Sequence, residues 1–134
     1  MKRQLINPPG TEATYDRLHL SQATRVGDLI WVSGQVGIDP TTRMTADGMK
    51  AQARFAFEGV QSVLEAAGAG LGDIVELTTF HTDLRGDIEE FVRVKDEYLP
   101  DRYPSWTAVG VTQLARPEFL VEIRVVAAAG SGNT

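Results

Sequence analysis

Residues 23–35 read ATRVGDLIWVSGQ, and this stretch decides the first part of the fold. Two β-prone runs, residues 23–26 and 29–32, flank the dipeptide Gly27-Asp28. A two-residue type II′ turn needs a positive φ at its first central position, which favours glycine there. The stretch therefore predicts a tight β-hairpin whose second strand runs on into residues 33–37.

Beyond the hairpin the hydrophobic period becomes that of a helix. From Asp47 onward, apolar residues recur every three or four positions on one stripe, and Gly68 ends the pattern as a C-terminal cap. The stripe consists of Met49, Ala53, Phe57, Val60, Leu64 and Ala67. A second amphipathic helix is predicted from Asp87, with Glu90 as its capping partner, up to Pro100.

The remaining segments are mostly strands. Residues 74–82, 106–111 and 119–127 are predicted strands, and residues 3–6 are compatible with a short edge strand. Pro8, Pro9 and Gly10 make the segment up to Tyr15 a predicted loop. Residues 130–134 are expected to form a frayed tail.

This order of elements predicts an α+β sandwich, a mixed sheet with two helices on one face, in a single domain over residues 1–134. The last strand carries apolar side chains on both of its faces. A two-layer monomer would leave one of those faces in water. We therefore expect the second face of the sheet to be buried against other subunits.

Composition narrows the functional classes. The 134 residues include no cysteine, so disulfides, thiol catalysis and cysteine-ligated metals are excluded. Thirteen Lys and Arg against 18 Asp and Glu give a net charge of −5, which argues against nucleic acid as a partner. No apolar stretch approaches the roughly 20 residues that span a bilayer, and no signal peptide is recognisable. The expected location is cytoplasmic.

Two groups of residues are candidates for a metal site and a nucleotide site, and the sequence supports neither site. His19 and His81 have no partner at the spacing of metal ligands, so no metal site is predicted. The glycines of residues 68–72 follow a helix and precede a strand, the reverse of a dinucleotide-binding loop. They are interpreted as a helix cap and connector.

Glu122 is the carboxylate that needs an explanation. It lies in the middle of a predicted strand, on the face that also holds Leu120 and Val126. Burying an unpaired carboxylate there is costly. One reading is an ion pair with Arg124 or an exposed position, and the other is a half-buried base in a cleft with a shifted pKa.

Two further positions are weaker candidates. Ser33-Gly34 closes the second hairpin strand with a residue that allows a ligand to approach the backbone, although glycine there is also typical of a bulge. Trp106 is either a packing residue or one wall of a binding site.

Short pieces of the sequence also follow an order typical of one family. They are Gly27-Asp28-Leu29-Ile30, Val32-Ser33-Gly34-Gln35, Ala51-Gln52-Ala53-Arg54, Glu65-Ala66-Ala67-Gly68, Gly72-Asp73-Ile74-Val75, Phe80 with Asp83-Leu84, Pro104, and Val121-Glu122-Ile123. In these pieces the chain resembles the Rid family, also called the YjgF family, of small enamine and imine deaminases. The resemblance covers about residues 20 to 128.

The resemblance implies a chorismate-mutase-like fold assembled as a homotrimer, with clefts between subunits that bind a small imine or enamine. It implies no cofactor. In that family the glutamate matched by Glu122 activates the water that attacks an imine carbon and releases ammonia. The backbone at Ser33 and Gly34 would hold the substrate, and an arginine would clamp its carboxylate.

The chain departs from the family pattern around this site. Trp106 stands at the position of the clamp arginine, Leu20 at that of a tyrosine, and Lys95 at that of an asparagine. With Phe80 from the matched pieces, these residues are expected to contact the ligand. Without the guanidinium, affinity for a 2-imino acid should fall by about tenfold to a hundredfold unless another cation replaces it.

Three cations are candidates for that replacement: Arg102, Arg116 and Lys95. The alternatives to a deaminase are a non-catalytic trimer that binds a metabolite or a protein, and an endoribonuclease, which the acidic charge disfavours.

Overall fold

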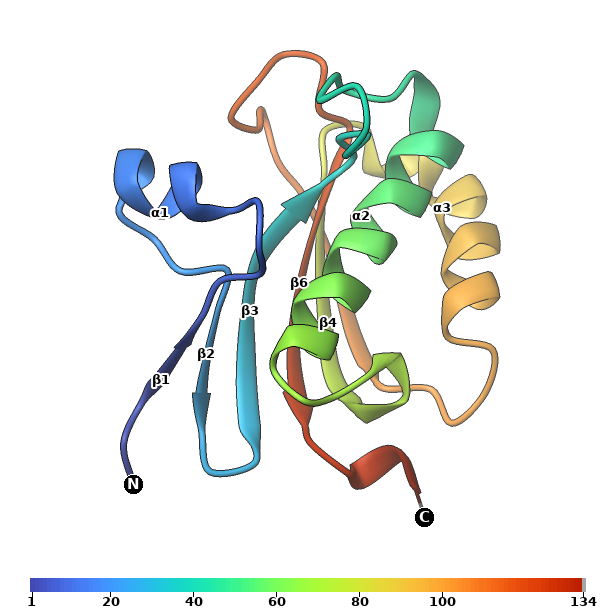
Figure 1. The fold of residues 1–134 in the computed structure, drawn as a ribbon. Coiled ribbons are helices and arrows are strands. Elements are labelled where there is room, and N and C mark those ends of the chain that lie inside the picture. The colour runs from blue at the N-terminus through green and yellow to red at the C-terminus, as the bar shows by residue number, and fades with distance from the viewer. Residues whose placement is uncertain (134) are drawn as a thin grey trace.

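The computed structural model describes residues 1–133, which form a mixed six-stranded sheet with helices packed on it (Figure 1). The strands are β1 Gln4–Ile6, β2 Ala23–Val26, β3 Leu29–Val36, β4 Ile74–His81, β5 Ser105–Gly110 and β6 Val121–Ala128. Their order across the sheet is β1-β2-β3-β6-β4-β5. β4 and β5 pair in parallel, and the other neighbours pair antiparallel.

The predicted hairpin is confirmed. β2 and β3 pair from Ala23 with Val32 to Val26 with Leu29. Gly27 has a φ of 58°, as the first central residue of a type II′ turn requires. Only the first half of β3 pairs with β2, so the second half is left as an edge on that side of the sheet.

The helices α2, Gly48–Ala66, and α3, Leu84–Tyr98, cover one face of the sheet (Figure 1). The apolar stripe predicted for α2 is buried, and Gly68 follows the helix with a φ of 86°, so both predictions are confirmed. Between sheet and helices lies one core, in which the largest buried side chains include Ile30, Phe57, Leu64, Leu77, Phe91 and Ile123. The α+β sandwich is therefore confirmed.

The start of α3 differs from the prediction. The helix begins at Leu84 after Asp83, and no side chain caps its N-terminus. Asp87 lies within the helix, with its carboxylate 3.6 Å from the buried His81 imidazole, so the predicted capping pair with Glu90 is wrong. The helix therefore starts about one turn earlier than predicted, after a two-residue turn that follows the end of β4 at His81.

Two terminal segments also differ. Glu12–Leu18 forms a short helix, α1, where a loop was expected; none of its side chains is buried, so it carries no apolar stripe to reveal it. Ser131–Asn133 form a short 3-10 helix, where Gly132 donates its N–H to Asp73 Oδ1 at 2.8 Å. The expected frayed tail is thus wrong for these residues, because Asp73 anchors them, and Thr134 lies outside the described residues.

The other face of the sheet carries both apolar and polar side chains. Leu29 is 45% exposed and Trp31 is 37% exposed, which is high for large apolar residues on central strands. Burial of this face by other subunits stays a prediction. Across residues 1–133, no helix combines the length and the apolarity that crossing a membrane needs.

Candidate functional site

A cavity of about 680 Å³ surrounds the unpaired edge of β3 and is bordered by α1, α2 and β6. It brings together four of the predicted site residues, Leu20, Ser33, Gly34 and Glu122. Much of its remaining lining is apolar, contributed by Leu18, Val36, Ile38, Phe55, Val63 and Phe119. The shape suits a small ligand with an apolar body that meets a few polar groups.

Glu122 joins this group of residues from β6, the strand that neighbours β3. On β6 it pairs with Val36 of β3 on one side and with Phe80 of β4 on the other. Its carboxyl group rests against Gly34 so closely that a Cβ at position 34 would lie 2.6 Å from Glu122 Cδ. Glycine is therefore required at position 34 to leave room for the carboxylate.

The surroundings of Glu122 favour the interpretation that it is a half-buried base in a cleft over the interpretation that it forms an ion pair with Arg124. Arg124 pairs instead with Glu76, its Nη1 lying 3.7 Å from Glu76 Oε1. Burial raises the pKa of the half-buried Glu122 above its ordinary value of 4.5. A carboxylate with a raised pKa at the wall of a cavity has the properties of a general base.

Ser33 uses both of its hydrogen-bond donors within the chain. Its N–H donates to the Gln22 carbonyl at 2.8 Å, and its hydroxyl donates to the Ser21 carbonyl at 2.7 Å. Both donors fasten residues 21–22 to β3, so neither is free for a ligand. The β3–β6 register shifts between Val32 and Gln35, and this bulge leaves Gly34 without a register partner on β6.

Gln52 is a positioning residue that the sequence reasoning missed. The side chain is 2% exposed and donates from Nε2 to the carbonyls of Ala46 and Glu118, at 3.0 and 2.8 Å. Its Oε1 accepts the Leu120 N–H at 2.8 Å. Gln52 thus ties the segment before Glu122 to α2. The sequence did contain a signal for this role, because Gln52 is a polar residue three positions after Met49, on the apolar stripe of the helix.

Trp106, Lys95 and Phe80 do not line the cavity. Trp106 faces α3, where its ring lies 5.9 Å from that of Phe91, and Lys95 Nζ lies 5.2 Å from its ring centroid. Phe80 lies beside Glu122 on the open face of the sheet. Within one chain, the predicted site residues therefore divide into two groups.

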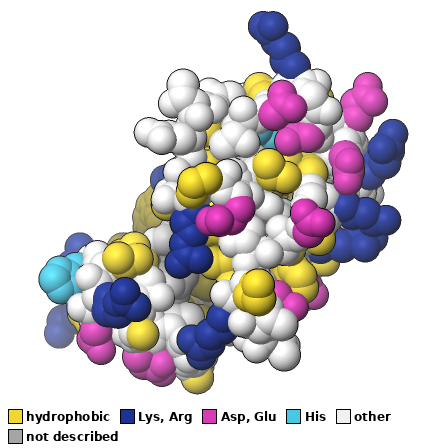
Figure 2. All heavy atoms as spheres, turned by 90° about the horizontal axis from the view of Figure 1, so that it is seen from above, with side chains coloured by type: hydrophobic (Ala, Val, Ile, Leu, Met, Phe, Trp, Pro, Cys, Tyr) yellow, Lys and Arg dark blue, Asp and Glu magenta, His cyan; other side chains and the backbone are white. Residues whose placement is uncertain are grey.

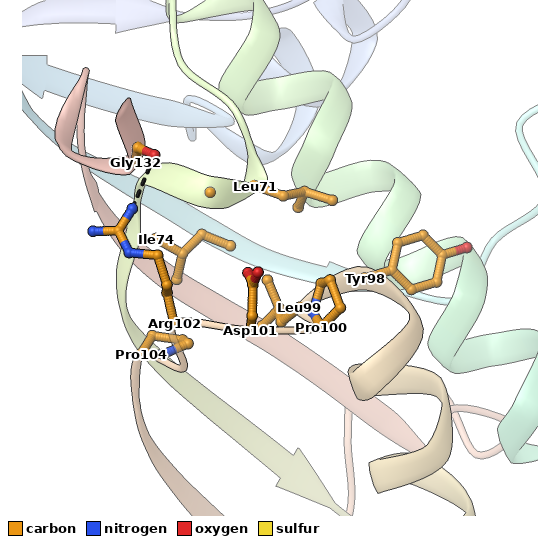
Figure 3. A pocket seen from close by; sticks show the side chains of 10 residues that line it. Leu71, Ile74, Tyr98, Leu99, Pro100, Asp101, Arg102, Pro104 and Gly132 are labelled. Atoms are coloured by element: carbon orange, nitrogen blue, oxygen red, sulfur yellow. Dashed lines mark hydrogen bonds between the residues drawn. The ribbon is translucent and has the colours of Figure 1, made fainter. Parts of the chain in front are cut away.

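The three candidate cations also lie apart. Arg116 lines the cavity with Glu122, its guanidinium 5.7 Å from the Phe119 ring centroid. Arg102 donates to the Gly132 carbonyl at 2.9 Å beside a separate cavity of about 150 Å³ (Figure 3). Of the three, only Arg116 shares a cavity with Glu122 in a single chain.

Charged side chains are mixed over the surface. On the face seen in Figure 2, basic and acidic side chains are interspersed with apolar ones, without a continuous basic area. Among residues 1–133, no three His, Asp or Glu side chains gather as a metal site would require.

Replacing Gly34 by Ala is expected to move the Glu122 carboxylate. The new Cβ would overlap the end of a flexible side chain, so Glu122 can turn away and the fold should persist. We expect any activity that needs Glu122 to fall by at least about tenfold, with a small change in melting temperature. Gly70→Ala is the control, because no atom lies within 4 Å of a Cβ there. Equal activity of Gly34→Ala and wild type would contradict this assignment.

The comparisons with known proteins agree with this architecture. The family model described as endoribonuclease L-PSP matches residues 11–129, and the chain belongs to this family. It is 41% identical to the RutC family protein YjgH of Escherichia coli strain K12, over 95% of each chain. A solved structure of protein YjgH aligns with a TM-score of 0.85 at 39% identity, covering 96% of this chain and 98% of that one.

Some similar proteins have an activity or a ligand in their names. A 2-iminobutanoate/2-iminopropanoate deaminase of Salmonella typhimurium strain LT2 is 32% identical, over 81% of this chain and 84% of its own. The structure of Escherichia coli TdcF with bound serine aligns with a TM-score of 0.78 at 29% identity, over 83% of this chain and 88% of that one. The resemblance to the YjgF and Rid proteins is confirmed.

Proposed function

We propose that this protein is a deaminase that hydrolyses a small imine or enamine, with Glu122 as its general base. The observation that carries the proposal is the Glu122 carboxylate, which is half-buried at a cavity wall, rests against Gly34 and has a raised pKa. The deaminase name of relatives at 31 and 32% identity supports the same chemistry.

The reaction needs only water and the side chains of the site. Glu122 takes a proton from water as the water oxygen forms a bond to the carbon of the protonated imine, whose C=N electron pair moves onto nitrogen. The resulting carbinolamine carries a hydroxyl and an amino group on one carbon. Protonated Glu122 then returns the proton to that nitrogen, the C–N bond breaks, and ammonia leaves with the bonding electron pair. Loss of the hydroxyl proton completes the carbonyl product.

The complete site is proposed to form between subunits of a trimer. Trp106 and Lys95 lie outside the cavity of their own chain, on and beside the edge strand β5. In a trimer, β5 of one subunit would bring these two residues to the Glu122 cavity of the next, and the open sheet face with Trp31 would be covered. Light scattering should give the mass of three chains.

Arg116 is proposed to bind the substrate carboxylate in place of the missing clamp arginine. Arg116→Ala should raise the KM for 2-iminopropionate about tenfold to a hundredfold, the effect of losing one charge-assisted hydrogen-bond pair, with a small change in kcat. Arg116→Lys should recover part of the loss. Arg43→Ala, a change of another arginine outside the cavity lining, is the control. An unchanged KM for Arg116→Ala would rule out this role.

Ammonia release from freshly generated 2-iminopropionate and from the larger imine of phenylalanine tests the proposed activity. Turnover of either imine supports the deaminase. A non-catalytic metabolite-binding protein, the second candidate, would release no ammonia yet would melt at a higher temperature with an added ligand such as serine, which TdcF binds. The net charge of −5 and the mixed surface charges give no support for RNA as the substrate.

A further inference from the structure

Two buried polar side-chain atoms in residues 1–133 have no hydrogen-bond partner, and they face each other. They are His81 Nδ1 on β4 and Asp87 Oδ1 on α3, which lie 3.6 Å apart. The His81 side chain is 0% exposed and that of Asp87 is 15% exposed. A pair of this kind inside an apolar core is costly, so it calls for a reason beyond packing.

The pair continues through hydrogen bonds to Trp106. His81 Nε2 lies 2.7 Å from Thr79 Oγ1, and the Trp106 indole Nε1 donates to the same hydroxyl oxygen at 3.0 Å. His81 and Thr79 point to the helix-covered side of β4, where Thr79 is also fully buried. A continuous polar path therefore links Asp87 on α3 to Trp106 on β5.

Only one assignment of protons along this path gives a hydrogen-bonding role to Thr79 Oγ1 and to both ring nitrogens of His81. The indole N–H can only donate, so Thr79 Oγ1 accepts it and gives its own proton to His81 Nε2. The imidazole proton then sits on Nδ1 and points at the Asp87 carboxylate. We propose that Asp87, His81 and Thr79 form a relay that fixes the orientation of the Trp106 indole, and thereby select the ligands that this wall admits.

The fixed ring also holds Lys95. The Lys95 ammonium group lies over both the Trp106 and Tyr103 rings, 5.2 and 5.7 Å from their centroids, and pairs with Asp96 at 3.2 Å. A turn of the indole would remove one face of this cation–π contact. The selecting role rests on the proposed function, in which Trp106 and Lys95 meet the ligand, whereas the relay itself does not.

The relay should respond to pH through Asp87. Burial, with the nearby carboxylates Asp83 and Glu90, raises the pKa of Asp87 to about 6. Burial lowers the pKa of His81 below its ordinary value, which favours the neutral form of the imidazole. Protonation of Asp87 should therefore change the hydrogen bond of the Trp106 indole N–H through His81 and Thr79.

Nuclear magnetic resonance of the indole N–H tests the relay without any assay of activity. The chain has two tryptophans, so a Trp31→Phe background leaves Trp106 as a single reporter. Its indole resonance should shift with a midpoint near that of Asp87, and this shift should disappear in Asp87→Asn. Thr79→Val should abolish the shift and speed indole proton exchange at least about tenfold, as expected when one buried hydrogen bond is lost.

Conservative variants separate the relay from general loosening of the core. Thr79→Ser keeps the hydroxyl and should keep both the titration and the slow exchange. Thr78→Val makes the same change one position away, on the other face of β4, and should have no effect. An indole resonance unchanged by Thr79→Val, or equally changed by Thr78→Val, overturns the relay.

A kinetic comparison tests the selecting role. Thr79→Val should raise KM more than it lowers kcat, and should do so more for the imine of phenylalanine than for 2-iminopropionate, because only the larger ligand reaches the indole wall. Equal changes for both imines would overturn selection by this wall while leaving the relay standing. If wild type turned over neither imine, the proposed function would fail and the indole resonance would still decide the relay.

Discussion

Replacing Glu122 by Gln is expected to lower kcat/KM for imine hydrolysis by about 10²- to 10⁴-fold, the usual contribution of a general base. Gln keeps the shape of Glu and its place against Gly34, but it cannot take a proton from water. Ammonia release by the two proteins at the same pH measures the effect. Glu76→Gln, which alters an exposed carboxylate on β4, is the matched control and should leave activity unchanged. Wild-type turnover in Glu122→Gln would contradict the assigned role.

The pH profile follows from the raised pKa of Glu122. Only the carboxylate form accepts a proton, so kcat/KM should rise with pH up to the pKa of Glu122, which burial places above 4.5, and then level off. This step should be missing from the residual activity of Glu122→Gln.

The contribution of Glu122 to the free energy of unfolding should depend on pH in the opposite direction to kcat/KM, falling as the pH rises. Because the pKa of Glu122 is higher in the folded than in the unfolded protein, the folded state binds this proton more tightly, and protonation stabilises the fold. Its contribution to the free energy of unfolding is complete below the unfolded pKa and is lost as pH rises through the folded one. Glu122→Gln should therefore be at least as stable as wild type at pH 7. Thermal melts of both proteins check this, and they show that lost activity does not reflect unfolding.

The largest effect on stability is expected at Gln52. Gln52→Ala removes three hydrogen bonds and leaves the Leu120 N–H and two carbonyl groups without a partner in the core. At about 1 kcal/mol for each net hydrogen bond, the loss should be about 3 kcal/mol. Denaturant unfolding followed by circular dichroism measures it. Because Gln52 anchors the segment before β6, activity should fall as well.

Gln61→Ala is the control for Gln52. It is the same substitution on the same helix, at a position that is only half-buried and outside the stripe of α2 that packs on the sheet. Its effect on the free energy of unfolding should stay within about 0.5 kcal/mol, as for most surface substitutions. Equal losses for the two variants would show that the hydrogen bonds of Gln52 have no special weight.

Local sequence patterns predicted well where a local cause operates. Gly27 sets the hairpin because few residues other than glycine tolerate its φ, and the period of the α2 stripe shows which side of that helix is buried. The patterns failed at α1, which buries no side chain and so leaves no period to read. They failed again at residues 131–133, which are held by Asp73, a residue far away in the sequence.

The sequence by itself determined the α+β class and the family, because periodicity, turn residues and short motifs are properties of neighbouring positions. It also singled out Glu122 as the candidate base. Only the tertiary structure decided that Ser33 donates to residues 21–22, that Arg116 shares the cavity of Glu122, and that Trp106 faces α3. Each of these facts depends on which strands pair and in which register. Contacts between residues distant in the chain are set by that pairing, and no local pattern contains it.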